Sequence, residues 1–396
     1  MKKHVLFVVT YLNTGGISRS LQNFLNCYDT RLFDVDVFAM VHQGVYKGVL
    51  KNCTVLKRCR LIEALVAHYE DQHGWAKVES FVMKLVDKVT KHQTRKKLFN
   101  RVGRHLLTKQ HYQAVVGFSE GLPTAFVAMM NHQNKIGWIH CDYSSYLKVG
   151  SGKSELSTYE ALQSVVCVSE FTRNSFVNIY PSMKERTFAI YNIIDDVMMK
   201  EKAKEPIDEC FDHSKFNIVS IGRIDPVKRL SIVPELARKV LDAGCQIRWY
   251  VIGPKGTDGE LKLFKDNIVK YNVDDIVIPL GEKANPYPYI SKADLLVNTS
   301  ISEACPYVIN EAKILQTPVV CTDFGSAKEF VDYGENGYYE PISELHVAVI
   351  SIIKNIKLPH LAYILSDFSY DNQSLLLKIY NILEGKTSTI FETKVQ

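Results

Sequence analysis

The sequence predicts an α/β protein built from two doubly wound, Rossmann-like domains, and three observations support this. The chain has 396 residues, which is more than one hydrophobic core usually serves. Short apolar runs of strand length alternate with longer amphipathic segments of helical period. An apolar run, a glycine turn and a helical segment begin at Val5 and again at Phe216, as in the first βα unit of a doubly wound sheet.

In the first half, apolar runs predict strands at 5–9, 33–38, 113–119, 135–139 and 164–169. Helices are expected after the first strand, within 61–110, and from Glu170. Gly15 and Gly16 follow the first strand, and His140 directly follows the strand 135–139. Ligands of open parallel sheets bind beyond the carboxyl ends of the strands. All three are therefore candidate site residues; a tight turn and a buried histidine are the alternatives.

In the second half, strands are predicted at 216–221, 246–253, 276–280, 295–297 and 319–321, with a helix from Leu230 to Leu241. A polar linker is expected before 214, helices at 346–354 and 374–383, and a frayed tail at 386–396. Arg223 and Lys228 lie in the turn after strand 216–221 and at the start of its helix. Free N–H groups, a forked guanidinium and an ammonium suit a diphosphate there; ordinary surface basic residues are the alternative.

Two glutamates flank the helix start that follows strand 295–297. Glu303 lies in the loop, Pro306 fits the first helical position, and Glu311 lies a little over one turn inside the helix. Both carboxylates can face the ligand crevice. A solvated loop carboxylate and a favourable acidic residue near a helix start are the alternatives.

These motifs make the sequence similar to the retaining GT-B glycosyltransferases of family four, the group 1 glycosyl transferases of bacterial surface polysaccharide synthesis. The resemblance rests on the glutamates at 303 and 311, on Gly222-Arg223 with Lys228 five residues after the arginine, and on Thr317-Pro318. It implies a GT-B fold of two domains facing a cleft. The implied domains are 1–193 on the acceptor side, 194–370 binding the nucleotide sugar, and a helix at 371–385 crossing back to the first domain.

The resemblance also implies residue roles in a retaining, metal-independent hexosyl transfer. Arg223 and Lys228 neutralise the diphosphate, Glu303 holds the sugar hydroxyls, and Glu311 accepts from the ribose. His140 contacts the donor sugar or its phosphate from the opposite domain, so that the reaction requires domain closure. Gly15, Gly16 and the residues Pro306, Tyr307 and Val308 complete the expected donor site. The expected donor is a nucleoside-diphosphate sugar, with UDP-sugar favoured, and no separate cofactor is expected.

The sequence departs from the family pattern at two positions, and two other functions stay open. The family commonly has glycine where this chain has Ala304 and Gln316, so a positive φ at residue 304 would be strained. A sugar-nucleotide epimerase of the same fold would use the donor without an acceptor. A non-catalytic partner of another glycosyltransferase would bind without turnover. A nicotinamide oxidoreductase is disfavoured because neither glycine turn has the Gly-x-Gly-x-x-Gly pattern.

Composition favours a cytoplasmic protein, or one that is peripheral at the inner face of the membrane. Nine cysteines without paired short spacing favour a reducing compartment and give no zinc signature. No apolar run approaches the ~20 residues that span a bilayer. Asp34 and Asp36 alternate within the strand 33–38, so no metal site is expected there. No feature indicates a nucleic-acid partner.

Net charge is divided unequally along the chain. Residues 1–190 carry a formal charge of +11 and the remainder −6, within a total of +5. Nine basic residues lie between Lys84 and Lys109, next to apolar positions at 85, 89, 98, 99, 106 and 107. Such a segment fits an anionic membrane surface, where a glycan or lipid-linked acceptor would be met. A solvated basic face is the alternative.

Overall fold

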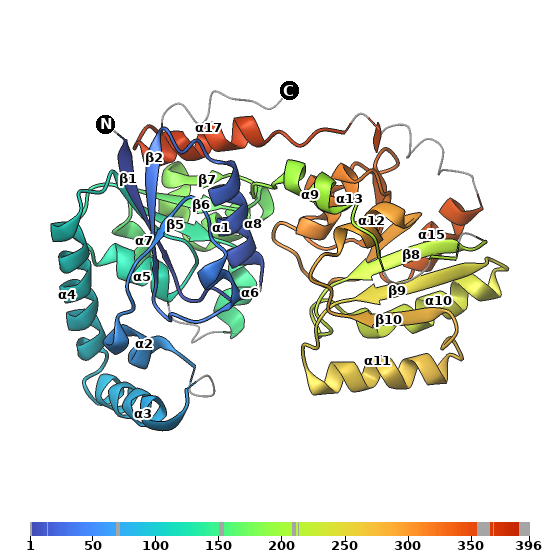
Figure 1. The fold of residues 1–396 in the computed structure, drawn as a ribbon, viewed down its shortest axis with the longest axis horizontal. Coiled ribbons are helices and arrows are strands. Elements are labelled where there is room, and N and C mark those ends of the chain that lie inside the picture. Colours follow the sequence, from blue (N-terminus) through green and yellow to red (C-terminus); the bar gives the residue numbers. More distant parts are fainter. Residues whose placement is uncertain are drawn as a thin grey trace. The chain divides into compact units, whose positions relative to one another are not determined.

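Two parallel sheets, each the centre of its own unit, organise the chain. The computed structural model describes residues 2–13, 15–68, 72–149, 154–207, 211–212, 214–354, 365–366 and 368–387. The first unit contains residues 1–194 and 371–396, and the second contains 195–370 (Figure 1). The sequence had placed this boundary after residue 193.

The first unit has a seven-stranded sheet in which every pairing is parallel. Its strand order is β3-β2-β1-β4-β5-β6-β7, so the order reverses between β1 and β4. The strands are β1 (Lys3–Val9), β2 (Phe33–Ala39), β3 (Thr54–Val55), β4 (Ala114–Gly117), β5 (Lys135–Ile139), β6 (Ser164–Cys167) and β7 (Thr187–Ala189). The central strands are buried except at the starts of β1 and β5, because helices cover a parallel sheet on both faces.

The helices of the first unit connect successive strands. They are α1 (Gly16–Cys27), α2 (Arg60–Val66), α3 (Gly74–Val89), α4 (Gln93–Lys109), α5 (Leu122–Ala128), α6 (Tyr143–Val149), α7 (Leu156–Glu160) and α8 (Glu170–Ile179), with 3-10 turns η1 (Val45–Gly48) and η3 (Pro181–Arg186). The region 61–110 is thus helical, as the sequence predicts. In it α3 packs against α2 and α4, at the far end of the unit in Figure 1.

The last described helix, α17 (Asn372–Leu383), packs on the first unit although it follows the second in sequence. Lys3 Nζ forms an ion pair with Glu384 just beyond its end. The backbone N–H of Asp29 donates to the Tyr380 hydroxyl at 2.7 Å, and Asn134 Nδ2 donates to the Leu383 carbonyl at 2.9 Å. Three widely separated strand and loop segments therefore hold this helix.

The second unit repeats the architecture with six parallel strands in the order β10-β9-β8-β11-β12-β13. They are β8 (Phe216–Ile221), β9 (Ile247–Ile252), β10 (Val277–Gly281), β11 (Leu295–Asn298), β12 (Val319–Thr322) and β13 (Gly337–Glu340). The helices are α9 (Asp196–Lys202), α10 (Val233–Asp242), α11 (Asp258–Lys270), α12 (Tyr287–Lys292), α13 (Tyr307–Ile314), α14 (Ala327–Phe330) and α15 (Leu345–Ile353), with the turn η4 (Leu230–Ile232).

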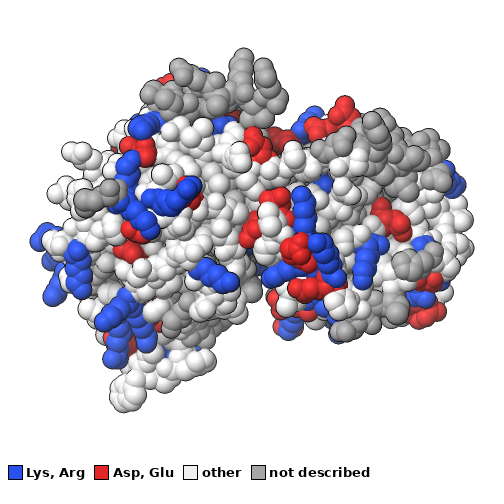
Figure 2. All heavy atoms as spheres, turned by 45° about the horizontal axis from the view of Figure 1, so that its top comes forward, with Lys and Arg blue, Asp and Glu red and all other residues white. Residues whose placement is uncertain are grey.

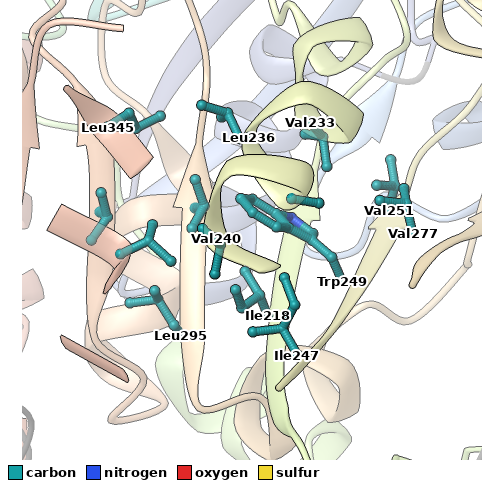
Figure 3. Close-up of a cluster of buried hydrophobic side chains, with 14 of the residues drawn as sticks. Ile218, Val233, Leu236, Val240, Ile247, Trp249, Val251, Val277, Leu295 and Leu345 are labelled. Atoms are coloured by element: carbon teal, nitrogen blue, oxygen red, sulfur yellow. The ribbon is translucent and has the colours of Figure 1, made fainter. Parts of the chain in front are cut away.

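The core of the second unit lies between the sheet and α10 (Figure 3). Trp249 on β9 is fully buried beneath the apolar face of α10, which carries Val233, Leu236 and Val240. Its indole Nε1 donates to Ser220 Oγ at 3.0 Å, so the polar atom of this large side chain is satisfied. This packing holds β8 and its following loop firmly in place.

The structure corrects two details of the sequence prediction and leaves a third largely outside the described residues. The expected linker before residue 214 contains α9, whose start is capped by Asp195 Oδ1 accepting from the Met198 N–H. The helix predicted from Leu230 begins as the turn η4 and becomes α-helical at Val233. The expected frayed tail at 386–396 lies outside the described residues from 388 onward.

Candidate donor site at the switch point of the second sheet

Two loops meet at the point where the strand order of the second sheet reverses. Strands β8 and β11 are neighbours, and their connections lead to helices in different directions from this point. In open α/β sheets such a switch point, beyond the carboxyl ends of the strands, is where ligands bind. The loop 222–229 follows β8 and the loop 299–306 follows β11, and these carry the residues that the sequence singled out.

Lys228 and Glu303 form an ion pair across the switch point. Lys228 Nζ lies 2.6 Å from Glu303 Oε1, although the two residues are 75 positions apart. Ser300 Oγ donates to the same carboxylate oxygen at 2.7 Å. Both charged side chains keep some exposure, 27% for Lys228 and 11% for Glu303. A cation and an anion are thus held together, within reach of a ligand.

Hydrogen bonds between the loops hold this pair in place. Thr299 Oγ1 donates to the Lys228 carbonyl at 2.8 Å, and the Ile301 N–H donates to the Val227 carbonyl at 2.8 Å. Ser326 Oγ donates to the Glu303 carbonyl at 2.8 Å. These hydrogen bonds tie the backbone on both sides of the ion pair.

Arg223 lies on the same loop as Lys228 but is much more exposed. Its Nη2 atom is 3.1 Å from Asp225 Oδ2. The other oxygen of Asp225 accepts the N–H groups of Val227 at 3.0 Å and Lys228 at 2.9 Å. Asp225 therefore shapes the loop and orients the guanidinium, which can turn toward an anion without losing buried contacts.

Two glycines, Gly222 and Gly253, allow close packing around this loop. A Cβ on Gly222 would stand 3.2 Å from Lys228 Cγ, so the aliphatic part of the lysine lies against this glycine. Gly253, with φ of 154°, lies so near that a Cβ there would stand 1.8 Å from the Gly222 carbonyl oxygen. Only glycine fits at 253, and the two loops after β8 and β9 are in direct contact.

Helix α13 begins at Tyr307, one residue later than the sequence predicts, and Pro306 is the preceding cap residue. The amides of Tyr307 and Val308 belong to the first turn, where N–H groups have no partner within the helix. Glu311 is only 2% exposed. A side chain with so little surface offers less direct geometric support for ribose contact than Lys228 and Glu303 offer for their roles.

Of the two departures from the family pattern, Gln316 is the strained one. Gln316 has φ of 64° directly after α13, a conformation that favours glycine, whereas Ala304 does not have a positive φ. The concern about strain at residue 304 was therefore wrong. The alanine fits the loop, and the left-handed position lies at the end of the following helix.

In the first unit, His140 follows β5 among aromatic rings. Its ring lies edge-on to Phe118, with centroids 4.9 Å apart, and is nearly parallel to Trp138 at 6.5 Å. Within the described chain, its buried Nε2 has no hydrogen-bond partner. Burial lowers the pKa of His140 to about 3, so this imidazole is neutral near pH 7. Its backbone N–H donates to Glu120 Oε2 at 3.0 Å, and burial raises the pKa of Glu120.

Gly15 is the N-cap residue of α1, and Gly16 is the first residue of this helix, which follows β1. Gly15 has φ of 152°, and a Cβ on either glycine would meet no atom of the described residues within 4 Å. The space next to these two glycines is therefore open. Asp36, part of the Asp-x-Asp pair in β2, accepts the Tyr112 hydroxyl at 2.7 Å, and Asp34 pairs with Lys2 at 3.3 Å.

Sequence reasoning missed the polar residues that support the ion pair. Ser300 binds the Glu303 carboxylate, Thr299 and Ser326 tie its loop, and Asp225 shapes the loop of Lys228. The Asp225-Pro226 dipeptide is a recognisable turn signal that could have indicated the last of these. The serine and threonine contacts join different loops, so no local pattern indicates them.

Comparison with known proteins finds a family match over the part of the chain that contains these residues. The model of the family described as glycosyl transferases group 1 matches residues 201–362, which include Arg223, Lys228, Glu303 and Glu311. The chain is 30% identical over 149 residues to the N-acetylgalactosamine-N,N'-diacetylbacillosaminyl-diphospho-undecaprenol 4-alpha-N-acetylgalactosaminyltransferase of Campylobacter jejuni. It is 22% identical over 169 residues to an uncharacterized glycosyltransferase of Methanocaldococcus jannaschii. The matches cover 37% and 42% of this chain and 38% and 41% of the relatives, less than half of their length.

Solved structures resemble the chain along nearly its whole length. HepE of Anabaena, solved in complex with UDP, superposes with a TM-score of 0.62 at 18% identity, covering 99% of each chain. The lipopolysaccharide outer core galactosyltransferase WaaB gives 0.66 at 12% identity, covering 97% of this chain and 99% of its own. At sequence identities this low, the structural similarity establishes the fold alone. The chain therefore has the GT-B fold, and its residues 201–362 match the model of the group 1 glycosyl transferases.

Proposed function

We propose that this chain is a retaining glycosyltransferase that moves a sugar from a nucleoside-diphosphate sugar, most simply a UDP-sugar, to a glycan or lipid-linked acceptor. The product would be a surface polysaccharide or a related glycan. The transfer is proposed to be of the hexosyl type and to need no metal. This proposal rests on the group 1 match to the second unit and on the residues gathered at its switch point.

The observation that carries the proposal is the ion pair between Lys228 and Glu303. In the chain alone, the Lys228 ammonium is paired with the Glu303 carboxylate. A donor diphosphate would take its place, because a phosphate offers Lys228 a stronger anionic partner and Arg223 can turn from Asp225 to the same group. Glu303, still held by Ser300, would then accept hydrogen bonds from the sugar hydroxyls.

This exchange also indicates how the reaction is accelerated. As the bond to the anomeric carbon breaks, negative charge grows on the leaving diphosphate. Two cations positioned on that group stabilise the transition state more than the ground state, which is what lowers a barrier. The amides at the start of α13 would add to this stabilisation, and Glu311 would bind the ribose.

His140 and the Gly15-Gly16 turn are proposed as further donor contacts from the first unit. Because the pKa of His140 is lowered to about 3, this residue would act as a neutral hydrogen-bonding group near pH 7. It would not contribute a positive charge to the diphosphate. Its proposed partner is therefore a sugar hydroxyl or a phosphate oxygen that accepts from the imidazole N–H.

The donor and acceptor classes are supported by similar proteins. HepE of Anabaena was solved with UDP and also with UDP-glucose, and the name of the Campylobacter jejuni relative describes an acceptor linked to diphospho-undecaprenol. A UDP-sugar donor and a lipid-linked acceptor are accordingly the first to test. An anionic membrane surface would then be a partner of the protein.

A donor screen followed by a product analysis tests the proposal. UDP, GDP and TDP sugars should be compared by thermal shift, because a bound ligand stabilises the folded protein. The selected donor is then incubated with and without acceptor, in buffer with and without EDTA, and the product anomer is read by NMR. Transfer with retention supports the proposal. Isomerisation of donor alone would indicate an epimerase, and binding of donor without any turnover would indicate a non-catalytic partner.

A further inference from the structure

Helix α3 presents its apolar side to solvent. Seven of its large apolar residues are 41–85% exposed, and the residues that it buries are the polar Ser80 and Asp87. The exposed residues are Trp75, Val78, Phe81, Val82, Leu85, Val86 and Val89. At about 100° per residue they form one continuous stripe roughly 140° wide. A stripe of this kind normally packs into a core.

The buried polar side is explained by what it binds. Asp87 Oδ2 lies 2.8 Å from His92 Nδ1 and 2.9 Å from Arg95 Nη2. Asp87 Oδ1 accepts the Arg95 N–H at 2.8 Å. Lys84 Nζ donates to the Ala67 carbonyl. The helix is thus fixed in an orientation that directs its apolar stripe outward, and rotating it to bury the stripe would break these contacts.

Basic residues border the stripe. Lys77, Lys84 and Lys88 follow one of its edges on α3, and further cations continue on α4, which packs against α3. Seven basic residues of α3, α4 and the turn between them form no ion pair with any residue that the structure describes: Lys88, Lys91, Lys96, Lys97, Arg101, Arg104 and Lys109. Figure 2 shows Lys and Arg side chains gathered on the outer part of this unit.

We propose that α3 lies in the headgroup layer of an anionic lipid bilayer, with its apolar stripe inserted and the basic residues of α3 and α4 on the lipid phosphates. A long exposed apolar stripe, an aromatic residue near one end and flanking lysines are the features of interfacial helices. The complementary charge favours this occupant over another protein. The sequence had expected Leu85, Val89 and Phe99 to share such a surface, but Phe99 is fully buried in the core, and Leu98, Leu106 and Leu107 pack against that core.

Trp75 is a built-in probe for this insertion. The chain has three tryptophans, and Trp138 and Trp249 are buried whereas Trp75 is 85% exposed. With vesicles of phosphatidylcholine and phosphatidylglycerol, emission should shift to the blue and be quenched by brominated acyl chains. Both signals should vanish in Trp75→Phe, which should still sediment with the vesicles.

Two matched double variants distinguish insertion of α3 into the bilayer from a general effect of making the protein surface more polar. Leu85→Ser/Val89→Ser changes side chains of α3 that are 49% and 74% exposed, and Leu263→Ser/Val269→Ser changes side chains of α11 that are 47% and 78% exposed. The α3 variant should bind vesicles roughly tenfold or more weakly than the wild type. The α11 variant should bind them as the wild type does. Melting temperatures of both variants should match the wild type, because no buried contact is removed.

The inference deepens the proposed lipid-linked acceptor but can fail separately from it. Lys228→Ala, which should abolish transfer, should bind vesicles like the wild type. Binding should require the anionic lipid and weaken with salt. The inference is wrong if the wild type ignores anionic vesicles at low salt, or if neutral vesicles bind it equally. It is also wrong if Leu85→Ser/Val89→Ser binds vesicles normally, or if that variant instead dissociates a dimer seen by light scattering.

Discussion

The carboxyl ends of the two sheets carry different chemistry on a similar topology. Both sheets are parallel and reverse their strand order beside their first strand. At this end of the second sheet, Lys228 pairs with Glu303 and Arg223 with Asp225. At the same end of the first sheet, burial shifts the pKa values of His140 and Glu120 toward their neutral forms. The second sheet holds ion pairs that a ligand can exchange, whereas in the first sheet burial favours the neutral forms of His140 and Glu120.

This difference shows how one architecture can serve two roles. Paired charges near the surface can change partner when an anionic ligand arrives, because the ligand replaces the lost ion pair. Neutral buried groups can donate and accept hydrogen bonds but cannot attract an anion from a distance. We infer that the second unit contributes the electrostatic part of the proposed transfer and the first unit contributes positioning.

The largest expected effect is a loss of transfer activity when a cation at the carboxyl end of the second sheet is removed. Lys228→Ala should lower transfer by roughly two to three orders of magnitude, since it removes a positioned charge from a developing anion, and Arg223→Ala should lower it by a similar factor. Steady-state transfer from the selected UDP-sugar measures this. Lys239→Ala, which breaks a surface pair with Glu235, is the matched control and should be near normal. Full activity in Lys228→Ala would contradict the inference that the second unit contributes the electrostatic part of the transfer.

Glu311 tests whether the second unit also binds the nucleotide. Glu311→Gln keeps the volume of this buried side chain but replaces its carboxyl group with an amide. It should weaken UDP affinity by about 1.5–3 kcal/mol, the range for a hydrogen bond to a charged group. Isothermal titration calorimetry with UDP gives the value, and a normal melting temperature excludes misfolding. Unchanged affinity would mean that Glu311 is a structural residue of α13.

The lowered pKa of His140 predicts that the stability of the folded protein depends on pH. His140 has its pKa lowered to about 3 by burial, while an unfolded histidine titrates near 6.5. Between these values the unfolded chain binds more protons, so this contribution to stability is complete above about pH 6.5 and is lost progressively as pH falls toward 3. At pH 5 the loss should be about 1 to 2 kcal/mol.

Comparison with His140→Gln isolates this contribution from neighbouring groups. Glu120, Cys141 and Asp142 also titrate near this strand end, and the raised pKa of Glu120 acts in the opposite direction. The denaturant midpoint of each protein is measured at pH 7 and pH 5. The wild type should lose more stability than the variant between these two values. Equal losses would show that the imidazole is charged or exposed in the folded protein.

The smallest expected effect concerns the backbone directly after the carboxyl end of α13. Gln316 has φ of 64°, so Gln316→Gly should raise the free energy of unfolding by about 1 kcal/mol, as glycine adopts this conformation without strain. Ala304→Gly is the paired control. It should give no gain, because residue 304 does not have a positive φ. Chemical denaturation measures both, and a gain at 304 alone would reverse the assignment of strain.

The sequence by itself determined most of the elements and their order, but it missed α9 and the strands β3, β7 and β13. Every strand expected from an apolar run is present, as are the helix starts at the two charged loops, because these depend on nearby residues whose periodicity and turn chemistry are local. The family motifs also placed Arg223, Lys228, Glu303 and Glu311 in one unit. The predicted strand ends and the start of α13 differ from the structure by one or a few residues, since local patterns define element ends poorly.

Only the tertiary structure decided which partners meet and which side of a helix is buried. The contact of Lys228 with Glu303 joins loops 75 residues apart, so it follows from the order of strands in the sheet and from no local pattern. The apolar stripe of α3 and the apolar face of α4 look alike in sequence, yet Phe99 on α4 is buried and Phe81 on α3 is 56% exposed. Periodicity states that a helix has an apolar side, whereas the ion pairs and hydrogen bonds of Asp87 and Lys84 determine which way that side turns.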